Sequence, residues 1–445
     1  MIGQFPWDPF PPSGEPDPKG PDPVHTIAFR SAVTSADAYR SVRLALRRES
    51  GTLRVGNRFV TDGRYRQVAF LAFGNAANSM ALAALHAVGD RLTQGFLAGP
   101  EPVVPEIPFR GVRVPPGWGG AREAKEAVAA AMEIAGGLSE QDLLLVLLSG
   151  GAVRSLTRPP PGMTEEEFGS LLRAAHEGGA TGAEVALVNR VLGEGAVAGR
   201  LARAIPNADV ATLIVDRGDG PKLLGGGPMH PLGPNERNDC GALLSRLDLQ
   251  EALPPAAFAN EPTEGAALPE RVARPVVVAS PGDALKAAAD AVFDKGWTSR
   301  LAFLDLRDTP TNAAGRFLAR SEELLVAEGL TSESRTKGVG AFAMTTLEVP
   351  EGVEDGPAFG QFLTSVQAGL RRREMSVGLF RTGGAVGAAE YPAGAVVGAS
   401  TDPEAHVRPD RARVVAMRRG ITDVGMLAVA LFPTPTAKGR AARAT

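Results

Sequence analysis

Short, continuous apolar runs alternate with helical patterns along most of this chain. Each run is long enough for one buried strand, and most are followed by a Gly-rich or polar turn. Strands that are apolar on both faces are typical of parallel sheets covered by helices on both sides. The pattern therefore predicts an α/β fold. The strands that we predict in the first part of the chain are Val68–Phe73, Leu143–Leu148, Ala211–Val215, Val276–Ala279 and Leu301–Leu304.

Helical periodicity follows several of these runs. An Ala-rich helix is expected from Ala76 to about His86, a second from about Asp283 to Lys295, and a third that ends near Glu328. Later apolar runs predict a second, smaller α/β unit near the C-terminus. These runs are Ala341–Val349, Val377–Phe380 and Ala395–Gly398.

A chain of 445 residues is too long for one hydrophobic core, so two domains are expected. We predict a larger Rossmann-like domain with a parallel sheet at 24–251 and a smaller α/β domain at 275–432. The segment 252–274 is rich in Pro, Ala and Glu, which is typical of a crossing between domains. A short polar tail at 433–445 completes the chain.

The first 23 residues form a Pro-rich arm that carries Phe5, Trp7 and Phe10. Proline excludes a regular helix or a central strand and favours extended conformations. Composition alone is typical of a disordered tail. The aromatic side chains favour the alternative that the arm docks on its own chain or on a neighbouring subunit, so we expect a homo-oligomer or a protein partner.

Composition narrows the function classes. A formal net charge of -3 gives no basis for nucleic-acid binding. The single cysteine, Cys240, excludes a disulfide or a cysteine-based metal site within one chain. No apolar run approaches the roughly 20 residues that span a bilayer, and the N-terminus lacks the order of a signal peptide. We therefore expect a cytoplasmic protein.

Three Gly-rich turns are candidates for binding an anion. They are Ser149-Gly150-Gly151, Gly225-Gly226-Gly227-Pro228 and Gly383-Gly384. Ligands of open α/β sheets lie at the carboxyl ends of strands, where such turns expose backbone N–H groups. None of the three matches the phosphate-loop or dinucleotide pattern, and each is also explained by a tight turn.

Charged candidates near these turns are few. Asp216 and Asp219 would either bind magnesium or cap a turn. The five histidines show no metal-ligand spacing. From the residues alone, the reaction stays open.

The order of several motifs resembles the glycerate kinase family that carries the MOFRL domain, whose members are often labelled hydroxypyruvate reductase. The resemblance extends from about Ile27 to Leu431. The segments that carry it are Leu144–Gly151, Pro159–Thr164, Arg190, Gly199–Ala202, Gly218-Asp219, Gly226–Pro228 and Ala393–Val397. It implies a Rossmann-like domain followed by a MOFRL-like region.

The chain departs from this family at charged positions. Gly74-Asn75-Ala76 stands where the family's first loop has a lysine, and Ile214-Val215 stands where the family has Ser-Asp. Arg190 is followed by apolar residues where the family has Lys-His. The segments Val114–Gly120, Phe359–Phe362 and Thr382–Ala385 also lack the family's polar residues.

Phosphoryl transfer depends on charge stabilisation by lysine, arginine and metal. The leading hypothesis is therefore a pseudoenzyme: a glycerate-kinase fold that has lost its activity and acts as a subunit, scaffold or small-ligand-binding protein. The alternative is an active kinase that uses ATP and Mg to phosphorylate glycerate or a related hydroxy acid. A reductase is the third reading, and it rests on family labels alone.

In the active alternative, Arg190, Asp219 and Lys222 are the catalytic candidates, and Asp216 and Asp219 would hold magnesium. Arg190 would bind the acid carboxylate or a phosphate, and Lys222 would lie near the transferred phosphate. The residues that we expect to bind a ligand are Asn75, Ser149, Gly150, Gly151, Arg190, Gly226, Gly227 and Gly383.

Overall fold

The structure is a computed structural model that describes eleven segments of the chain. These are 23–56, 58–115, 121–205, 207–216, 227–258, 268–331, 334–347, 355–370, 375–381, 394–398 and 426–433. The aromatic residues of the N-terminal arm lie outside them, so its docking stays a prediction. No helix in these segments is long and apolar enough to cross a membrane.

The first sheet has six strands, and every neighbouring pair is parallel. In spatial order they are β11 (Val276–Ala279), β10 (Asp209–Val215), β7 (Asp142–Leu148), β4 (Gln67–Phe73), β5 (Leu92–Gly99) and β6 (Arg110–Arg113). The central strands β4 and β7 are buried along nearly their whole length, as their unbroken apolar sequences require.

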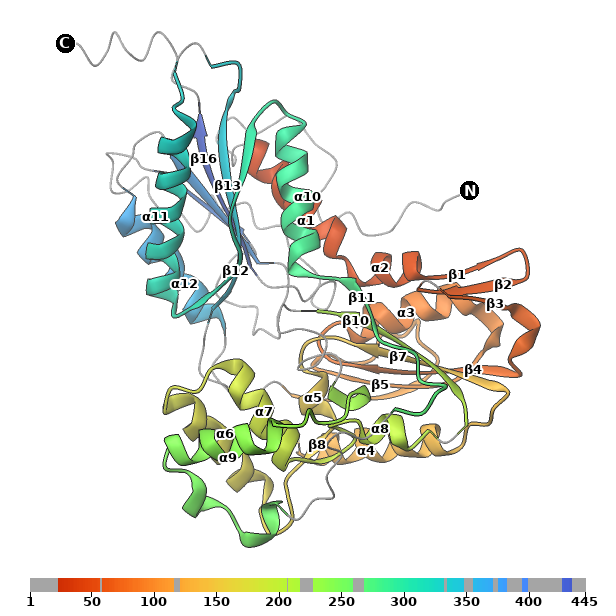
Figure 1. Cartoon of the computed structure of the whole chain (residues 1–445). Coiled ribbons are helices and arrows are strands. Elements are labelled where there is room, and N and C mark those ends of the chain that lie inside the picture. Colours follow the sequence, from red (N-terminus) through yellow and green to blue (C-terminus); the bar gives the residue numbers. More distant parts are fainter. Residues whose placement is uncertain are drawn as a thin grey trace, which may run out of the picture.

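Helices cover both faces of this sheet (Figure 1). On one face lie α2 (Ala38–Ala45) and α3 (Ala77–Val88), whose small side chains pack against β4 and β10. On the other face lie α4 (Ala121–Gly136), α5 (Ala152–Ser155) and α8 (Arg200–Arg203). A small antiparallel sheet extends one edge of the domain. Its strands are β1 (Leu46–Glu49), β2 (Thr52–Val55) and β3 (Arg58–Thr61).

A separate helical cluster lies below the first sheet in Figure 1. It consists of α6 (Glu165–Glu177), α7 (Gly182–Leu192) and α9 (Glu236–Arg246), which share their own apolar core. Capping boxes begin the first two helices, because Thr164 and Thr181 each exchange hydrogen bonds with a glutamate three residues later. The two-residue strands β8 (Thr157–Arg158) and β9 (Glu194–Gly195) join this cluster to the sheet.

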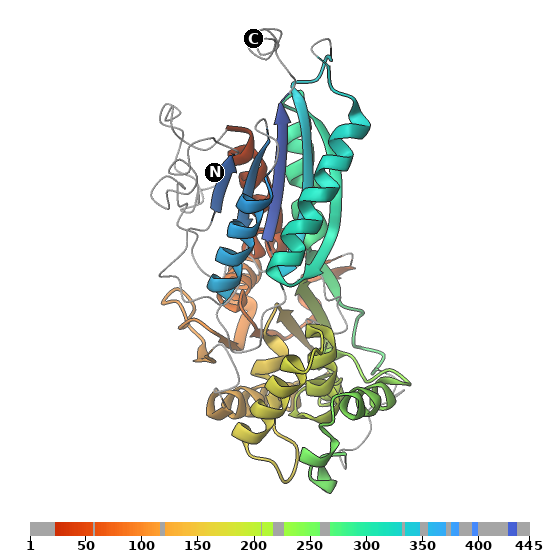
Figure 2. The same cartoon turned by 90° about the vertical axis from the view of Figure 1, so that its left-hand side faces the viewer.

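The second sheet has five strands and is mixed. In spatial order they are β12 (Thr298–Asp308), β13 (Gly338–Leu347), β16 (Met426–Pro433), β14 (Ser376–Arg381) and β15 (Gly394–Gly398). Only β12 and β13 are parallel; the other pairs among these strands are antiparallel. One face packs on α11 (Pro310–Glu328) and α12 (Asp355–Gly369), which stand side by side in Figure 2.

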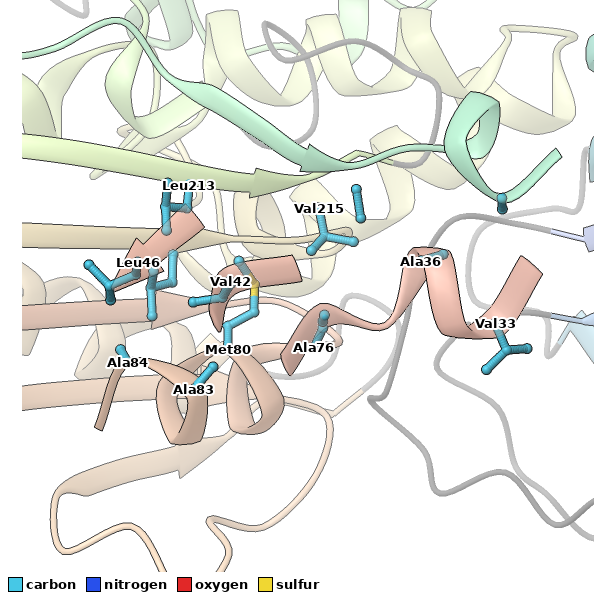
Figure 3. Close-up of a cluster of buried hydrophobic side chains, with 14 of the residues drawn as sticks. Val33, Ala36, Val42, Leu46, Ala76, Met80, Ala83, Ala84, Leu213 and Val215 are labelled. Carbon is cyan, nitrogen blue, oxygen red and sulfur yellow. The ribbon is translucent and has the colours of Figure 1, made fainter. Parts of the chain in front are cut away.

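The other face of the second sheet is covered by α1 (Pro23–Ala36) and α10 (Pro281–Phe293). The first helix of the chain therefore packs on its last strands, and β11 lies in the first sheet although it follows the Pro-rich crossing. One apolar cluster runs from the first sheet through these helices to the second sheet. Figure 3 shows part of it, with Val33 and Ala36 of α1 in line with Val42, Met80 and Val215.

The predicted α/β class and the larger parallel sheet are confirmed. Each strand predicted from an apolar run is present within a few residues of the expected bounds, from β4 to β15. The helix predicted from Ala76 is α3, and those predicted near Asp283 and Glu328 are α10 and α11. Short 3-10 turns complete the described elements, at Asp62–Arg64, Gly89–Arg91, Gly227–Met229, Gln250–Ala252 and Pro255–Phe258.

Candidate functional site

The strand order of the first sheet reverses between β4 and β7. From β4 the chain proceeds outwards through β5 to β6, then returns to place β7 on the other side of β4 and proceeds through β10 to β11. This is the order of the Rossmann fold, in which ligands bind in the crevice beyond the carboxyl ends of the strands at the reversal point. The loops that follow β4 and β7 therefore form the candidate site.

These two loops are held together by direct hydrogen bonds. The backbone N–H of Asn75 donates to the carbonyl oxygen of Gly150 at 2.8 Å. The backbone N–H of Ala76 donates to the hydroxyl oxygen of Ser149 at 2.9 Å, and that side chain is fully buried. Of the predicted ligand-binding residues, Asn75, Ser149, Gly150 and Gly151 are thus brought to one place. The Ser149 hydroxyl joins the two loops.

Gly74 shows how closely the loops approach. Its φ is +108°, and a Cβ atom there would lie 2.5 Å from both the carbonyl and the hydroxyl oxygen of Ser149. Any side chain would separate the loops, so glycine is required by both conformation and space. The loops after β4 and β7 are therefore in direct contact at Gly74.

The positively charged side chain of Arg154 lies close to these two loops. Gly151 is in the left-handed region with φ +83°, and a Cβ atom there would lie 3.3 Å from Oδ1 of Asn75 and 3.3 Å from Nη2 of Arg154. Asn75 is 8% exposed and Arg154 is half-buried. Sequence reasoning missed Arg154. The signal was a basic residue in the short helix α5 directly after the Gly-rich turn.

Asp216 lies at the carboxyl end of β10, next to β7, and is 8% exposed. Its backbone N–H donates to the carbonyl oxygen of Ala279 at 2.9 Å, which fixes the end of the strand against β11. The carboxylate therefore belongs to the same edge of the sheet as the two loops. Among the described residues, no three His, Cys, Asp or Glu side chains form a cluster that could hold a metal ion by themselves.

Gly227 lies against the same region. A Cβ atom there would lie 3.0 Å from Cγ2 of Val153 in α5 and 3.9 Å from Cδ of Arg190. Gly227 thus packs on the helix that carries Arg154. The candidates Asp219, Lys222 and Gly226 fall in the segment 217–226, and Gly383 falls in 382–393, both outside the described residues.

Arg190 is buried beside this loop, with 1% of its side chain exposed. Its guanidinium donates to Oε1 of Glu236 at 2.9 Å and to the carbonyl oxygen of Pro231 at 3.4 Å. The pKa of Arg190 is lowered, because the effect of burial outweighs the opposing effect of the Glu236 carboxylate. Glu236 also accepts a hydrogen bond from the N–H of Gly233. In this structure Arg190 therefore braces the segment that follows Gly227.

Comparison with known proteins assigns the family. Residues 25–260 match the family described as "Domain of unknown function (DUF4147)". A glycerate kinase of Bos taurus is 32% identical over 235 residues, which cover 47% of this chain and 43% of that enzyme. The chain belongs to the glycerate kinase family. A protein of Agrobacterium vitis named "Putative hydroxypyruvate reductase" is 30% identical over 221 residues, 49% of this chain and 47% of that protein.

The fold of most of the chain is similar to that of a solved structure. A glycerate kinase from Thermotoga maritima has a TM-score of 0.66 and 19% identity, with 93% of this chain and all of that structure covered. This likeness extends over both sheets. In contrast, the chain matches less than half of the length of these curated relatives. The family match at residues 25–260 includes the loops after β4, β7 and β10.

These relatives overturn one expectation. The interpretation as a pseudoenzyme that acts as a subunit, scaffold or ligand-binding protein is wrong, because the related proteins are glycerate kinases in both sequence and fold comparisons. That interpretation treated each missing charged residue of the family as a separate loss. The charge in a crevice depends on every side chain that the loops bring together, and Arg154 lies beside the uncharged Asn75.

Proposed function

We propose that this protein is an ATP-dependent kinase that phosphorylates glycerate. The observation that carries the proposal is the convergence of the β4, β7 and β10 ends at the reversal point of the sheet. Kinship with glycerate kinases supports the substrate class. The glycerate hydroxyl oxygen bonds to the γ-phosphorus of ATP, the bond from that phosphorus to the bridging oxygen breaks, ADP leaves, and the hydroxyl proton is released.

The loops after β4 and β7 would position the phosphates in this reaction. Phosphoryl transfer requires little covalent chemistry from the protein, and depends on positioning and charge stabilisation. The direct contact of Asn75 with Gly150 is suited to positioning. Magnesium neutralises phosphate charge when it is bound. It usually takes one or two carboxylates together with phosphate oxygens, and the buried Asp216 at the crevice fits that role.

Asp219 and Lys222 remain candidates for the metal and for the transferred phosphate, respectively. Arg190 supports the site by holding the segment that follows Gly227, through its ion pair with Glu236. A reductase is not proposed, because Gly74-Asn75-Ala76 after β4 lacks the three-glycine fingerprint of dinucleotide enzymes.

The test compares Asp216→Asn with Asp209→Asn in an assay of ADP release with ATP, Mg and glycerate. Asp209 is the first residue of β10 and Asp216 directly follows its last residue, so the two aspartates lie at opposite ends of the strand. Asp209 accepts hydrogen bonds from Arg64 and from the hydroxyl of Tyr65, away from the crevice. We expect Asp216→Asn to lower kcat by roughly 100-fold or more, as is usual when a group that stabilises transition-state charge is removed.

Asp209→Asn should keep the wild-type kcat even where it lowers stability. Equal kcat for the wild type and Asp216→Asn would remove Asp216 from the site. No glycerate-dependent ADP release by the wild type would contradict the proposed function itself.

The setting of this activity is also proposed. We place the protein in the cytoplasm, in keeping with the lack of a membrane-spanning helix among the described residues. The Pro-rich arm before α1 is expected to contact a second copy or another protein through Phe5, Trp7 and Phe10.

A further inference from the structure

The position of Arg154 has a consequence beyond the general reaction. Its Nη2 lies on the same side of Gly151 as Oδ1 of Asn75, since both are 3.3 Å from the place where a Cβ atom of Gly151 would be. The guanidinium therefore turns back over the loop that follows β7. The guanidinium of Arg154 thus lies close to Asn75 in the loop that follows β4, at the reversal point of the sheet.

The surroundings hold this side chain in place. Arg154 belongs to α5, whose neighbouring residues Val153 and Ser155 are buried. Val153 contacts the Gly227 region, and the Ser155 hydroxyl donates to the carbonyl oxygen of Gly151. A half-buried guanidinium on such a fixed turn loses little freedom on binding.

The chemistry of this pair suits a phosphate. A guanidinium presents several N–H donors in a planar fork that matches phosphate oxygens, and its charge strengthens each hydrogen bond. The Asn75 carboxamide carries no charge; its oxygen, which lies towards Gly151, is a buried acceptor, and only its amide nitrogen can donate to a phosphate oxygen. A Cβ atom on Gly151 would be in tight contact with both groups, so glycine at this position permits the close approach of Arg154 to Asn75.

We propose that Arg154 and Asn75 bind phosphate oxygens of the nucleotide, with Arg154 supplying the positive charge that the Asn75 loop lacks. This inference rests on the proposed function, since it names the residues that hold the nucleotide in that reaction.

The experiment uses the full chain and two measurements. Isothermal titration gives the Kd for ADP with Mg, and steady-state kinetics gives KM for ATP and for glycerate. The variants are Arg154→Gln, Arg154→Lys and Asn75→Asp. The control is Arg173→Gln, at an exposed arginine on α6 that donates a hydrogen bond to the hydroxyl of Ser170. Thermal melts show that each variant is folded.

We expect Arg154→Gln to raise the Kd for ADP by about 10- to 100-fold, since a hydrogen bond to a charged group contributes about 1.5–3 kcal/mol. KM for glycerate should change less than twofold. Arg154→Lys keeps the charge without the planar fork and should retain part of the affinity. Asn75→Asp places a carboxylate beside the phosphates and should weaken ADP binding even where Arg154→Gln fails to fold. Arg173→Gln should match the wild type.

The outcomes separate this inference from the proposed function. An active wild type whose ADP affinity is unchanged in Arg154→Gln and Asn75→Asp overturns the inference and leaves the kinase intact. A larger effect on glycerate than on ADP also overturns it, since Arg154 would then bind the acid. A wild type that binds ADP through Arg154 but does not phosphorylate glycerate supports the inference and contradicts the proposed substrate. A wild type that does not bind ADP overturns the inference.

Discussion

Ser149 follows β7 in a Gly-rich turn, and its sequence context alone is compatible with an anion-binding hydroxyl. In the fold its hydroxyl oxygen accepts from the N–H of Ala76 and lies 3.4 Å from the carbonyl oxygen of Phe73. The side chain is fully buried between two strands. Its role is to fasten the β4 loop to the β7 loop.

Gly74 makes that fastening testable. We expect Gly74→Ala to lower the free energy of unfolding by about 2 kcal/mol or more, because the added Cβ would collide with Ser149 and the residue must keep a positive φ. Urea denaturation measures the change. The matched control is Gly315→Ala in the middle of α11, where an added Cβ meets nothing within 4 Å.

Gly315→Ala should raise the stability by about 0.5–1 kcal/mol, as alanine does in an unobstructed helix. If both variants gave the same small change, the close approach of the two loops described here would be wrong.

At the scale of elements, the position of α1 was not predicted. Its residues are mildly apolar without a strong helical stripe, and nothing in the local pattern relates them to strands some 350 residues later. His25 in this helix is fully buried, stacks on Phe29, and forms a hydrogen bond of 3.0 Å with the hydroxyl of Ser376 in β14. The helix α1 is therefore, together with α10, an integral part of the layer that covers one face of the second sheet.

His25 makes the stability depend on pH. Burial lowers its pKa to about 3 from an ordinary value near 6.5. Between these two values the unfolded chain binds a proton that the folded chain does not, so stability is lost as pH falls below 6.5. We expect this histidine to reduce the free energy of unfolding by about 1.4 kcal/mol at pH 5.5 relative to pH 7.5.

Urea denaturation of the wild type and of His25→Gln at the two pH values checks this expectation. Glutamine cannot take up a proton, but it can still form a hydrogen bond with Ser376. The variant should lose about 1.4 kcal/mol less than the wild type over this range. An identical pH dependence of the two proteins would show that His25 is accessible to solvent in the folded state.

Strand prediction succeeded for most continuous apolar runs, but it missed β16, although Met426–Phe432 is also continuously apolar. The runs that became β4, β7 and β10 are central, so both of their faces are largely buried and nearly every position after the first is apolar. The strands β5 and β6 were missed because β5 begins with Leu92-Thr93-Gln94-Gly95 and β6 is a four-residue edge strand with two arginines. Edge strands carry polar residues, and the local pattern resembles a loop.

At the scale of the molecule, two sheets share one apolar cluster, and helices α1, α2 and α10 lie between them. The order of motifs was sufficient to identify the family, since each motif marks the end of a strand whose position the fold fixes. The state of the site could not be predicted in the same way. Arg154 lies close to Asn75, which belongs to another loop, and only the pairing of β4 with β7 brings the two together.

The activity that we propose for this protein is phosphoryl transfer from ATP to glycerate. It is tested most directly by incubating the purified full chain with ATP, Mg and glycerate and following the mixture by phosphorus NMR. We expect equimolar formation of ADP and a phosphoglycerate, with no ADP formed when glycerate is omitted. Unchanged ATP at micromolar enzyme, or ADP and free phosphate without a phosphoglycerate signal, would contradict it.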